Sequence, residues 1–439
     1  MQEETLRILK MLEEGKITAS EAERLLQALT GKTSKQLLTP EKPFRPKDFH
    51  HWPWKYGTHP GRVVAEVMKS VNPGKIVAEV MEGIRESGLT SDFRWNKCSH
   101  QEEEKITIPR EEIKEITLNN LRGDIEIRGT EGEEIVIVAE KTAWGEDEEE
   151  ATSRTKGISI ETEKEGENLR IKVEAGPWIK KRHAEIDFQL SIPRDLNLII
   201  SATNGDIKAY NLCNKSNLSA VSGDILLENS SGDFELSSVN GEIEVQNVSG
   251  QELKASTVNG DLEIKDTKSK ILLKTMSGNA EIKQTEGRIE INSMSGDIEI
   301  RDSQGDLSLI TQSGDITLED IDGALQVDSV SGDLEMKNLQ TGLLKASTTS
   351  GDISASLTLK EKGECQIRTT SGDIELEIPE ETKATIEAKT QSGTLDLAEL
   401  ENLQKQTELG KTRISGIINA PEGKILLASI SGDISVETL

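Results

Sequence analysis

The chain has 439 residues, a formal net charge of −27 at pH 7, and 30% charged but only 3% aromatic side chains. This acidic balance argues against a nucleic-acid partner and against electrostatic binding to an anionic bilayer, because both need clustered Lys and Arg. The three cysteines are odd in number and far apart, and they show neither a disulfide framework nor a metal-binding CxxC spacing.

The sequence carries no recognisable secretion signal and no apolar run of transmembrane length. The default expectation is therefore a cytoplasmic protein with no transmembrane segment. Association with the cell surface by a non-classical route stays open as the alternative.

Residues 1–31 predict an α-helical hairpin. Leu6, Leu9 and Leu12 recur at helical spacing, and Thr18 begins a capping box at the start of a second helix. A hairpin of this size is seldom stable alone, so its apolar face predicts a contact with another copy, another domain or a partner.

Residues 32–60 are rich in Pro and aromatic side chains and predict a linker. Trp52, Trp54 and Tyr56 make this linker a candidate interaction arm, because Trp and Tyr clusters favour interfaces. Two alternatives stay open for the stretch "FHHWPWKYGTHP": packing on the rest of the chain, and metal binding by its histidines.

Residues 61–104 predict a second, short helical pair followed by a linker. The pentapeptide VAEVM occurs at Val64–Met68 and again at Val77–Met81, each time within an apolar stripe that follows a Gly. From residue 105 the apolar period changes to two, which predicts strands. Residues 105–200 thus predict an irregular β region, interrupted at Glu146–Gly157 by a charged loop or an exposed helix.

Residues 201–439 contain an internal repeat. A Gly recurs about every nine residues, and a stronger [S/N]-G-D unit recurs about every 18, as in "SGDIEIRDSQGDLSLITQ" (Ser295–Gln312). Periods of this length predict a solenoid. Gly296 suits a corner, while Ile298 and Ile300 point to one side of a strand and Glu299 and Arg301 to the other.

The fold class is therefore mainly β: a single-chain β-solenoid with about 18 residues per coil, preceded by small α-helical hairpins. Inward positions form aliphatic columns, which explains the low aromatic content. One such column consists of Ile207, Ile225, Ile243, Leu262, Ile298, Ile316, Leu334, Ile353, Ile374, Leu395 and Ile434. The sequence ends soon after a repeat strand, "DISVETL", which predicts a bare solenoid end. Such an edge would be covered by another part of the chain or would pair with a second copy, giving a homo-oligomer.

These repeats, entered through "DFQLSIPRDLNLIISATNGDI", resemble the bacterial putative-adhesin domain family of unknown function. The stretch "LRILKMLEEGKITASEAERLLQAL" is similar to the short helical N-terminal domain of YvlB- and LiaX-like envelope-stress proteins. The resemblance covers residues 3–30 and about 105–439. It implies a β-solenoid, no known catalytic residues and a role in cell-envelope stress signalling.

An outward column of acidic residues is the candidate interaction face, fitted to a protein partner or a cationic peptide. It consists of Glu244, Glu263, Glu281, Glu299 and Glu335. Beside it lie basic residues, and diagonal Glu–Lys pairing across strands is expected to offset the repulsion between like charges. A charge-striped sheet face with no partner is the alternative interpretation.

A second acidic column occupies the corner position after each Gly. It consists of Asp206, Asp224, Asp261, Asp297, Asp315, Asp333, Asp352, Asp373 and Asp433. Stacked carboxylates can hold Ca²⁺, but the glycine pattern of calcium-binding repeats is missing and Asn279 interrupts the column. Hydrogen bonding within the turn is the preferred interpretation, so no metal site is predicted.

No nucleophile–base set, phosphate-binding loop or dinucleotide fingerprint is present in the sequence, so no catalytic residue, cofactor or enzymatic activity is predicted. The sequence predicts a non-enzymatic interaction scaffold. Two alternatives stay open: a structural or adhesive surface protein that assembles through its solenoid ends, and a polysaccharide-active solenoid enzyme.

Overall fold

A computed structural model of the chain describes residues 98–176, 178–179, 183–397, 404–408 and 411–438. The chain divides into two units, Met1–Gly57 and Thr58–Leu439, and all described residues belong to the second. The predicted hairpin at 1–31, the linker at 32–60 and most of the segment 61–104 lie outside the described residues. The part of that segment that is described, residues 98–104, is strand rather than linker.

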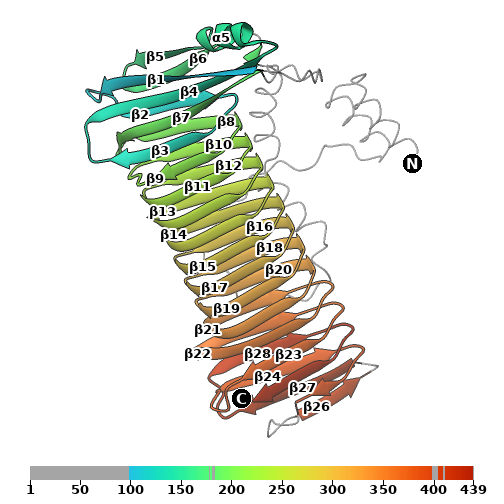
Figure 1. Ribbon diagram of the computed structural model, residues 1–439. Helices are drawn as coiled ribbons and strands as arrows, with labels where there is room; N and C mark the ends of the chain where they lie inside the picture. The colour runs from blue at the N-terminus through green and yellow to red at the C-terminus, as the bar shows by residue number, and fades with distance from the viewer. Residues whose placement is uncertain (1–97, 177, 180–182, 398–403, 409–410, 439) are drawn as a thin grey trace, which may run out of the picture. The chain divides into compact units, whose positions relative to one another are not determined.

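The described residues form a parallel β-solenoid, which confirms the predicted fold class (Figure 1). Ile298 pairs with Ile316, and Leu307 pairs with Leu325, both in parallel register. Each coil of 18 residues therefore contributes two strands, which belong to two sheets on opposite sides of the core. We call these sheets face A and face B.

Face A contains the strands that follow the [S/N]-G-D corner, together with the first halves of four long strands that continue around the next corner. They are β9 (Ile207–Tyr210), β11 (Ile225–Ser231), β13 (Ile243–Asn259), β14 (Leu262–Ser277), β15 (Ala280–Glu286), β17 (Ile298–Gln304), β19 (Ile316–Asp322), β21 (Leu334–Ser347), β22 (Ile353–Arg368) and β23 (Ile374–Ile378). Face B contains the second halves of the long strands with β8 (Asn197–Asn204), β10 (Ser216–Ser222), β12 (Phe234–Asn240), β16 (Ile289–Ser295), β18 (Leu307–Ser313) and β20 (Leu325–Ser331).

The core lies between the two faces and consists almost entirely of aliphatic side chains. Along β17 the residues alternate between buried and half-buried, with Ile298 and Ile300 inside, as the period of two predicts. Most residues of the predicted inward column are buried, while Leu395 near its end is half-buried. Buried hydroxyls fill the corners, where Thr285 and Ser303 of neighbouring coils share a hydrogen bond of 2.9 Å.

The [S/N]-G-D corner is held by a hydrogen-bond ladder along the stack. The Asp315 amide donates to Oδ1 of Asp297 at 2.9 Å, and the Asp297 amide donates to Oδ1 of Asn279 at 2.9 Å. The corner column thus accepts hydrogen bonds from backbone amides, but the bonds join successive coils rather than closing within one turn as the sequence predicts. Asn279 fits because its amide oxygen accepts in the same way. At the opposite corner the turn residue has positive φ, for example 51° at Asp302 and 54° at Asn338. Asn and Asp tolerate this conformation best after Gly.

The N-terminal end of the solenoid is built out of sequence order. The coil formed by β2 (Glu115–Asn120) and β3 (Ile125–Thr130) lies between the β8–β9 coil and a later pair, β6 (Asn168–Glu174) and β7 (Ala184–Pro193). Three antiparallel strands close this end: β1 (Cys98–Pro109), β4 (Glu134–Gly145) and β5 (Ser159–Glu165). The charged excursion is a helix, α5 (Glu148–Lys156), which packs against β1 and β4.

The C-terminal end is also out of order, and another part of the chain covers the start of the edge at "DISVETL", which is one of the two outcomes that the sequence leaves open. β28 (Gly423–Ala428) lies between β22 and β24 (Ala384–Thr390), and β29 (Ile434–Thr438) lies between β23 and β25 (Leu395–Asp396). The last segment of the chain therefore forms the penultimate coil. The antiparallel hairpin β26 (Gln404–Glu408) and β27 (Lys411–Ile418) covers β24. Within the described residues, β25 pairs with Ile434 and Ser435 of β29, and Val436–Thr438 pair only with β23.

Candidate functional site

The predicted interaction column lies on the outer side of face A, and the structure ties most of it into ion pairs. Each basic partner stands two residues after the Glu on the same strand, on the same outer side. The pairs are Glu263–Lys265, Glu281–Lys283, Glu299–Arg301 and Glu335–Lys337. Arg301 also reaches Glu319 of the next coil, at 3.2 Å. Pairing is therefore mainly within a strand rather than diagonal as expected. At the position of the basic partner, Glu244 has Gln246 instead.

The hydrogen bonds within these ion pairs also shift the pKa values of their members. The hydrogen bond from Lys283 holds the pKa of Glu281 below its ordinary value, and the hydrogen bond to Glu263 raises the pKa of Lys265. These shifts favour the charged forms of Glu281 and Lys265. Exposed pairs of this kind contribute little to stability, but they cancel most of the field that a cationic partner would sense.

One corner carboxylate departs from the ladder. Glu242 occupies the Asp position, and its amide donates to Oδ1 of Asp224 at 2.8 Å. Among the described residues, no hydrogen bond joins the Glu242 carboxylate to the Asp261 amide, whereas shorter Asp side chains elsewhere reach the next amide. Burial raises the pKa of Glu242, and the neighbouring carboxylates of Glu263 and Asp224 raise it further.

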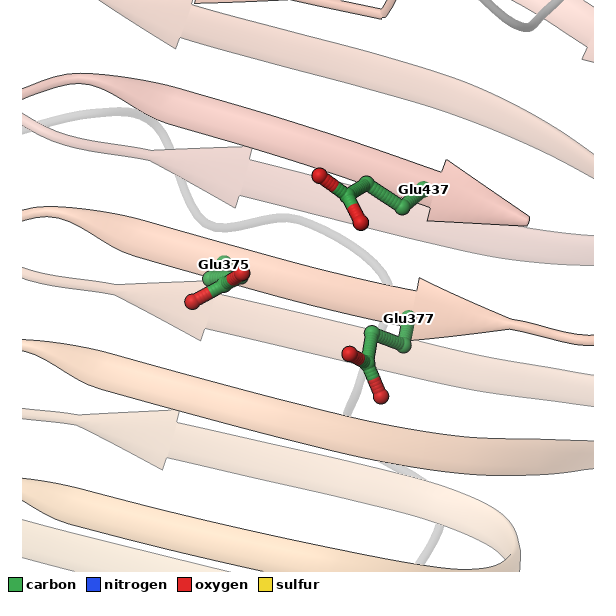
Figure 2. Close-up of side chains that lie close together, drawn as sticks. All are labelled: Glu375, Glu377 and Glu437. Carbon is green, nitrogen blue, oxygen red and sulfur yellow. The ribbon is translucent and has the colours of Figure 1, made fainter. Parts of the chain in front are cut away.

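A second acidic group on face A emerges only from the fold. Glu375 and Glu377 lie on β23, and Glu437 lies on β29, which pairs Glu377 with Glu437 directly (Figure 2). We call these three residues the acidic cluster. One oxygen from each carboxylate lies within 4.8 Å of the others. Glu375 and Glu437 are exposed, and Glu377 is half-buried.

The acidic cluster differs from the column in its neighbours. Within the described residues no Lys or Arg forms an ion pair with any of its members, and its strand neighbours on the outer face are serines, such as Ser354 and Ser435. Three unpaired carboxylates at this spacing can accept hydrogen bonds from a basic side chain or ligate a hard cation. Sequence reasoning missed the group because β29 follows β23 by a long excursion. The shared "GDI" corner motif was the only signal that both strands belong to one stack.

A shallow groove of about 730 Å³ runs along the positive-φ corner. Its lining includes Asn229, Asn247, Asp266, Lys268, Glu286 and Asp302. Several of these groups bind one another: the Asn247 side chain donates to Asn229 at 2.7 Å, and Lys268 pairs with Glu286 at 2.7 Å. The groove lining therefore serves mainly to hold this corner together.

The remaining predicted site residues are placed as follows. Trp52, Trp54 and Tyr56 lie outside the described residues. Cys365 is buried, and burial raises its pKa to about 12, which keeps the thiol protonated. Cys213 is exposed. No helix in the described part of the chain is long and apolar enough to cross a membrane.

Comparison with solved structures finds proteins of low identity. A "putative cell adhesion protein" from Clostridium sporogenes is 9% identical, with 77% of this chain and 100% of that chain covered and a TM-score of 0.19. A "putative lipid binding protein" from Parabacteroides distasonis is 13% identical, with 77% and 96% covered and a TM-score of 0.23. A "putative adhesin" from Parabacteroides merdae is 14% identical, with 77% and 96% covered and a TM-score of 0.21.

Comparison with curated proteins finds no match. Two family models do match the sequence. A SHOCT-like domain model matches residues 3–34. The Toastrack DUF4097 model matches residues 93–320 and 303–437, which together span most of the chain and nearly all of the solenoid. Because this match covers more than half of the chain, the chain belongs to the Toastrack DUF4097 family.

Proposed function

We propose that this protein is a non-enzymatic scaffold that binds a basic protein surface or a cationic peptide at the acidic cluster of face A. The observation that carries the proposal is the contrast between two acidic surfaces on one sheet. Most members of the column Glu263 to Glu335 have basic partners of their own, whereas Glu375, Glu377 and Glu437 have none among the described residues.

This contrast decides where a cation would bind. A basic side chain that approaches Glu281 must displace Lys283, so it exchanges one ion pair for another. At the acidic cluster it instead relieves repulsion, which amounts to about 0.9 kcal/mol for each pair of charges 4.8 Å apart in water. The solenoid supports this role because paired strands fix the spacing of the three glutamates along the backbone before binding.

The physiological setting we propose is the response to cell-envelope stress. It is supported by the resemblance of residues 3–30 to the N-terminal domain of envelope-stress proteins. In this setting the solenoid presents the acidic cluster and the N-terminal region carries the signal onward.

Binding is tested with two triple variants of equal charge change. The first is E375Q/E377Q/E437Q, and the matched control is E263Q/E281Q/E299Q on the same face. A fluorescent amphipathic Leu/Lys peptide is titrated against each full-length protein at low salt, and anisotropy is recorded. The proposal expects the cluster variant to bind about tenfold more weakly and the control to change little. Equal losses in both variants would indicate non-specific attraction to net charge and would overturn the proposed site.

The setting is tested separately in cells. Intact cells are treated with protease, and the protein is followed with an antibody beside a cytosolic marker. Cleavage with the marker intact places the chain outside the membrane, where cationic peptides reach it directly. Protection until lysis contradicts a surface sensor and restricts the scaffold to basic partners inside the cell.

A further inference from the structure

Face B carries an apolar stripe on its outer side, next to the [S/N]-G-D corner. The stripe consists of Val221, Val239, Val258, Met276 and Met294, one from each of five successive coils. The registers on either side of these residues align them: Ala220 pairs with Ser238, and Ser222 pairs with Asn240. All five side chains are half-buried and alternate with buried residues, so they point away from the core.

The columns on both sides of the stripe are almost free of charge. On the strand side they are Ser219, Ser237, Ser256, Lys274 and Asn292, and on the corner side Ser222, Asn240, Asn259, Ser277 and Ser295. In this band of three columns, which we call the neutral band, only Lys274 is charged. Charged residues make up 30% of the chain and dominate the outer side of face A. A depletion of charge around partly exposed Val and Met is typical of the centre of an interface rather than of free surface.

The sequence contains a segment with the complementary pattern. Apolar residues recur at i, i+1, i+4, i+5 and i+8 in two tandem copies, which is the spacing of one helical face. The first copy is Val63, Val64, Val67, Met68 and Val71, and the second is Ile76, Val77, Val80, Met81 and Ile84. A helix over residues 75–87 would be about 20 Å long, and five coils of the neutral band span about 19 Å.

The point at which the described chain begins allows this segment to reach the band. On β4, Ala143 pairs with Ala184, the first residue of β7. Cys98 of β1 pairs with Gly145, two residues further along β4, so it lies just past the start of β7. This places Cys98 on the edge of the solenoid that carries the Gly123 corner, which is also the edge of the stripe. From β1 to the level of Val221 there are five strand spacings, about 24 Å. The nine residues 89–97 span up to about 30 Å when extended.

We propose that residues 61–88 form a helical pair whose second helix docks, by its Val and Met face, on the neutral band of face B in the same molecule. The docked pair would hold the segment that precedes β1 against the side of the solenoid. This assignment is independent of the acidic cluster, which lies on the opposite face.

The test uses limited trypsin digestion of the full-length protein, because residues 61–88 contain Arg62, Lys69, Lys75 and Arg85. The double variant V239D/M276D places charge in the neutral band, and the matched control N217D/S308D places the same charge elsewhere on the outer side of face B. The docked segment is expected to be cut slowly in the wild type and the control, and about tenfold faster in V239D/M276D.

Thermal melting and hydrogen exchange distinguish loss of docking from unfolding of the solenoid. Thermal melting of the solenoid must be alike in the two double variants, and hydrogen exchange of the amides in residues 76–84 must rise together with cleavage in V239D/M276D. Rapid cleavage of the wild type, or equal cleavage of both variants, overturns the proposal. Protection that appears only as protein concentration increases would assign the band to a second copy and would overturn it as well.

Discussion

Replacing Gly296 by alanine is expected to separate two coils of the solenoid. Gly296 has φ of 119°, and a Cβ at this position would lie 2.1 Å from the carbonyl oxygen of Gly278. Ordinary contacts begin near 3.4 Å, so the coils must move apart by more than 1 Å. That movement weakens the hydrogen bond from the Asp297 amide to Asn279, which measures 2.9 Å.

The magnitude follows from these two effects. Positive φ costs a non-glycine residue about 1–2 kcal/mol, and losing a hydrogen bond at the corner costs about 1 kcal/mol more. The total is about 3 kcal/mol. Two other glycines separate the contributions. G166A meets no atom within 4 Å but keeps φ of 66°, so about 1 kcal/mol is expected. G342A meets no atom, and no left-handed φ restrains it, so its effect should be near zero.

The assay is urea denaturation combined with hydrogen exchange of amides near each substitution, because coils of a solenoid can open locally. The expected order of destabilisation is G296A, then G166A, then G342A. Faster exchange should centre on the coils of Gly278 and Gly296. A free energy of unfolding for G296A within about 0.5 kcal/mol of that for G342A would refute the steric account of the corner.

Three further outcomes are expected. D297A should lower stability by about 1 kcal/mol in thermal melts, because it removes the side-chain acceptor for the Asp315 amide of the next coil. D297N should be nearly neutral, because the Asn279 side chain already accepts the equivalent hydrogen bond. Similar losses of stability in both variants would contradict the hydrogen-bond ladder. Since the folded state raises the pKa of Glu242, its charged form opposes folding above that pKa. E242Q should therefore have a higher melting temperature than the wild type at pH 7, and this difference should vanish as the pH falls below 4.5, the ordinary pKa of Glu. A difference in melting temperature that grows on acidification would contradict a raised pKa of Glu242. In thiol labelling of the folded protein, Cys213 should react at once and Cys365 only after unfolding, and early labelling of Cys365 would contradict its burial.

Much of this fold could be predicted because the repeat is local. The corner Gly, the Asp that follows it and the alternation of Ile298, Glu299 and Ile300 lie within a few residues of one another. The backbone conformation of the corner and the alternation along the strand can therefore be predicted from the sequence. Stacking at a fixed interval of 18 residues then brings like residues together, so the repeat predicts the members of the inward column residue by residue. The sequence predicts diagonal ion pairs across strands, whereas Glu299 pairs with Arg301 on its own strand, because side-chain reach depends on strand geometry.

The tertiary structure alone decided which coils are neighbours at the two ends. Periodicity predicts adjacency only while each turn has constant length, and the excursions within residues 131–196 and 379–433 break that condition. β29 therefore lies against β23 and brings Glu437 to Glu377, and β2 and β3 lie between coils formed later in the chain. The sequence by itself determined the shape of one coil, because a coil depends on local torsions and alternation. The order of the coils depends on which open edge each strand can pair with, and no local pattern encodes that choice.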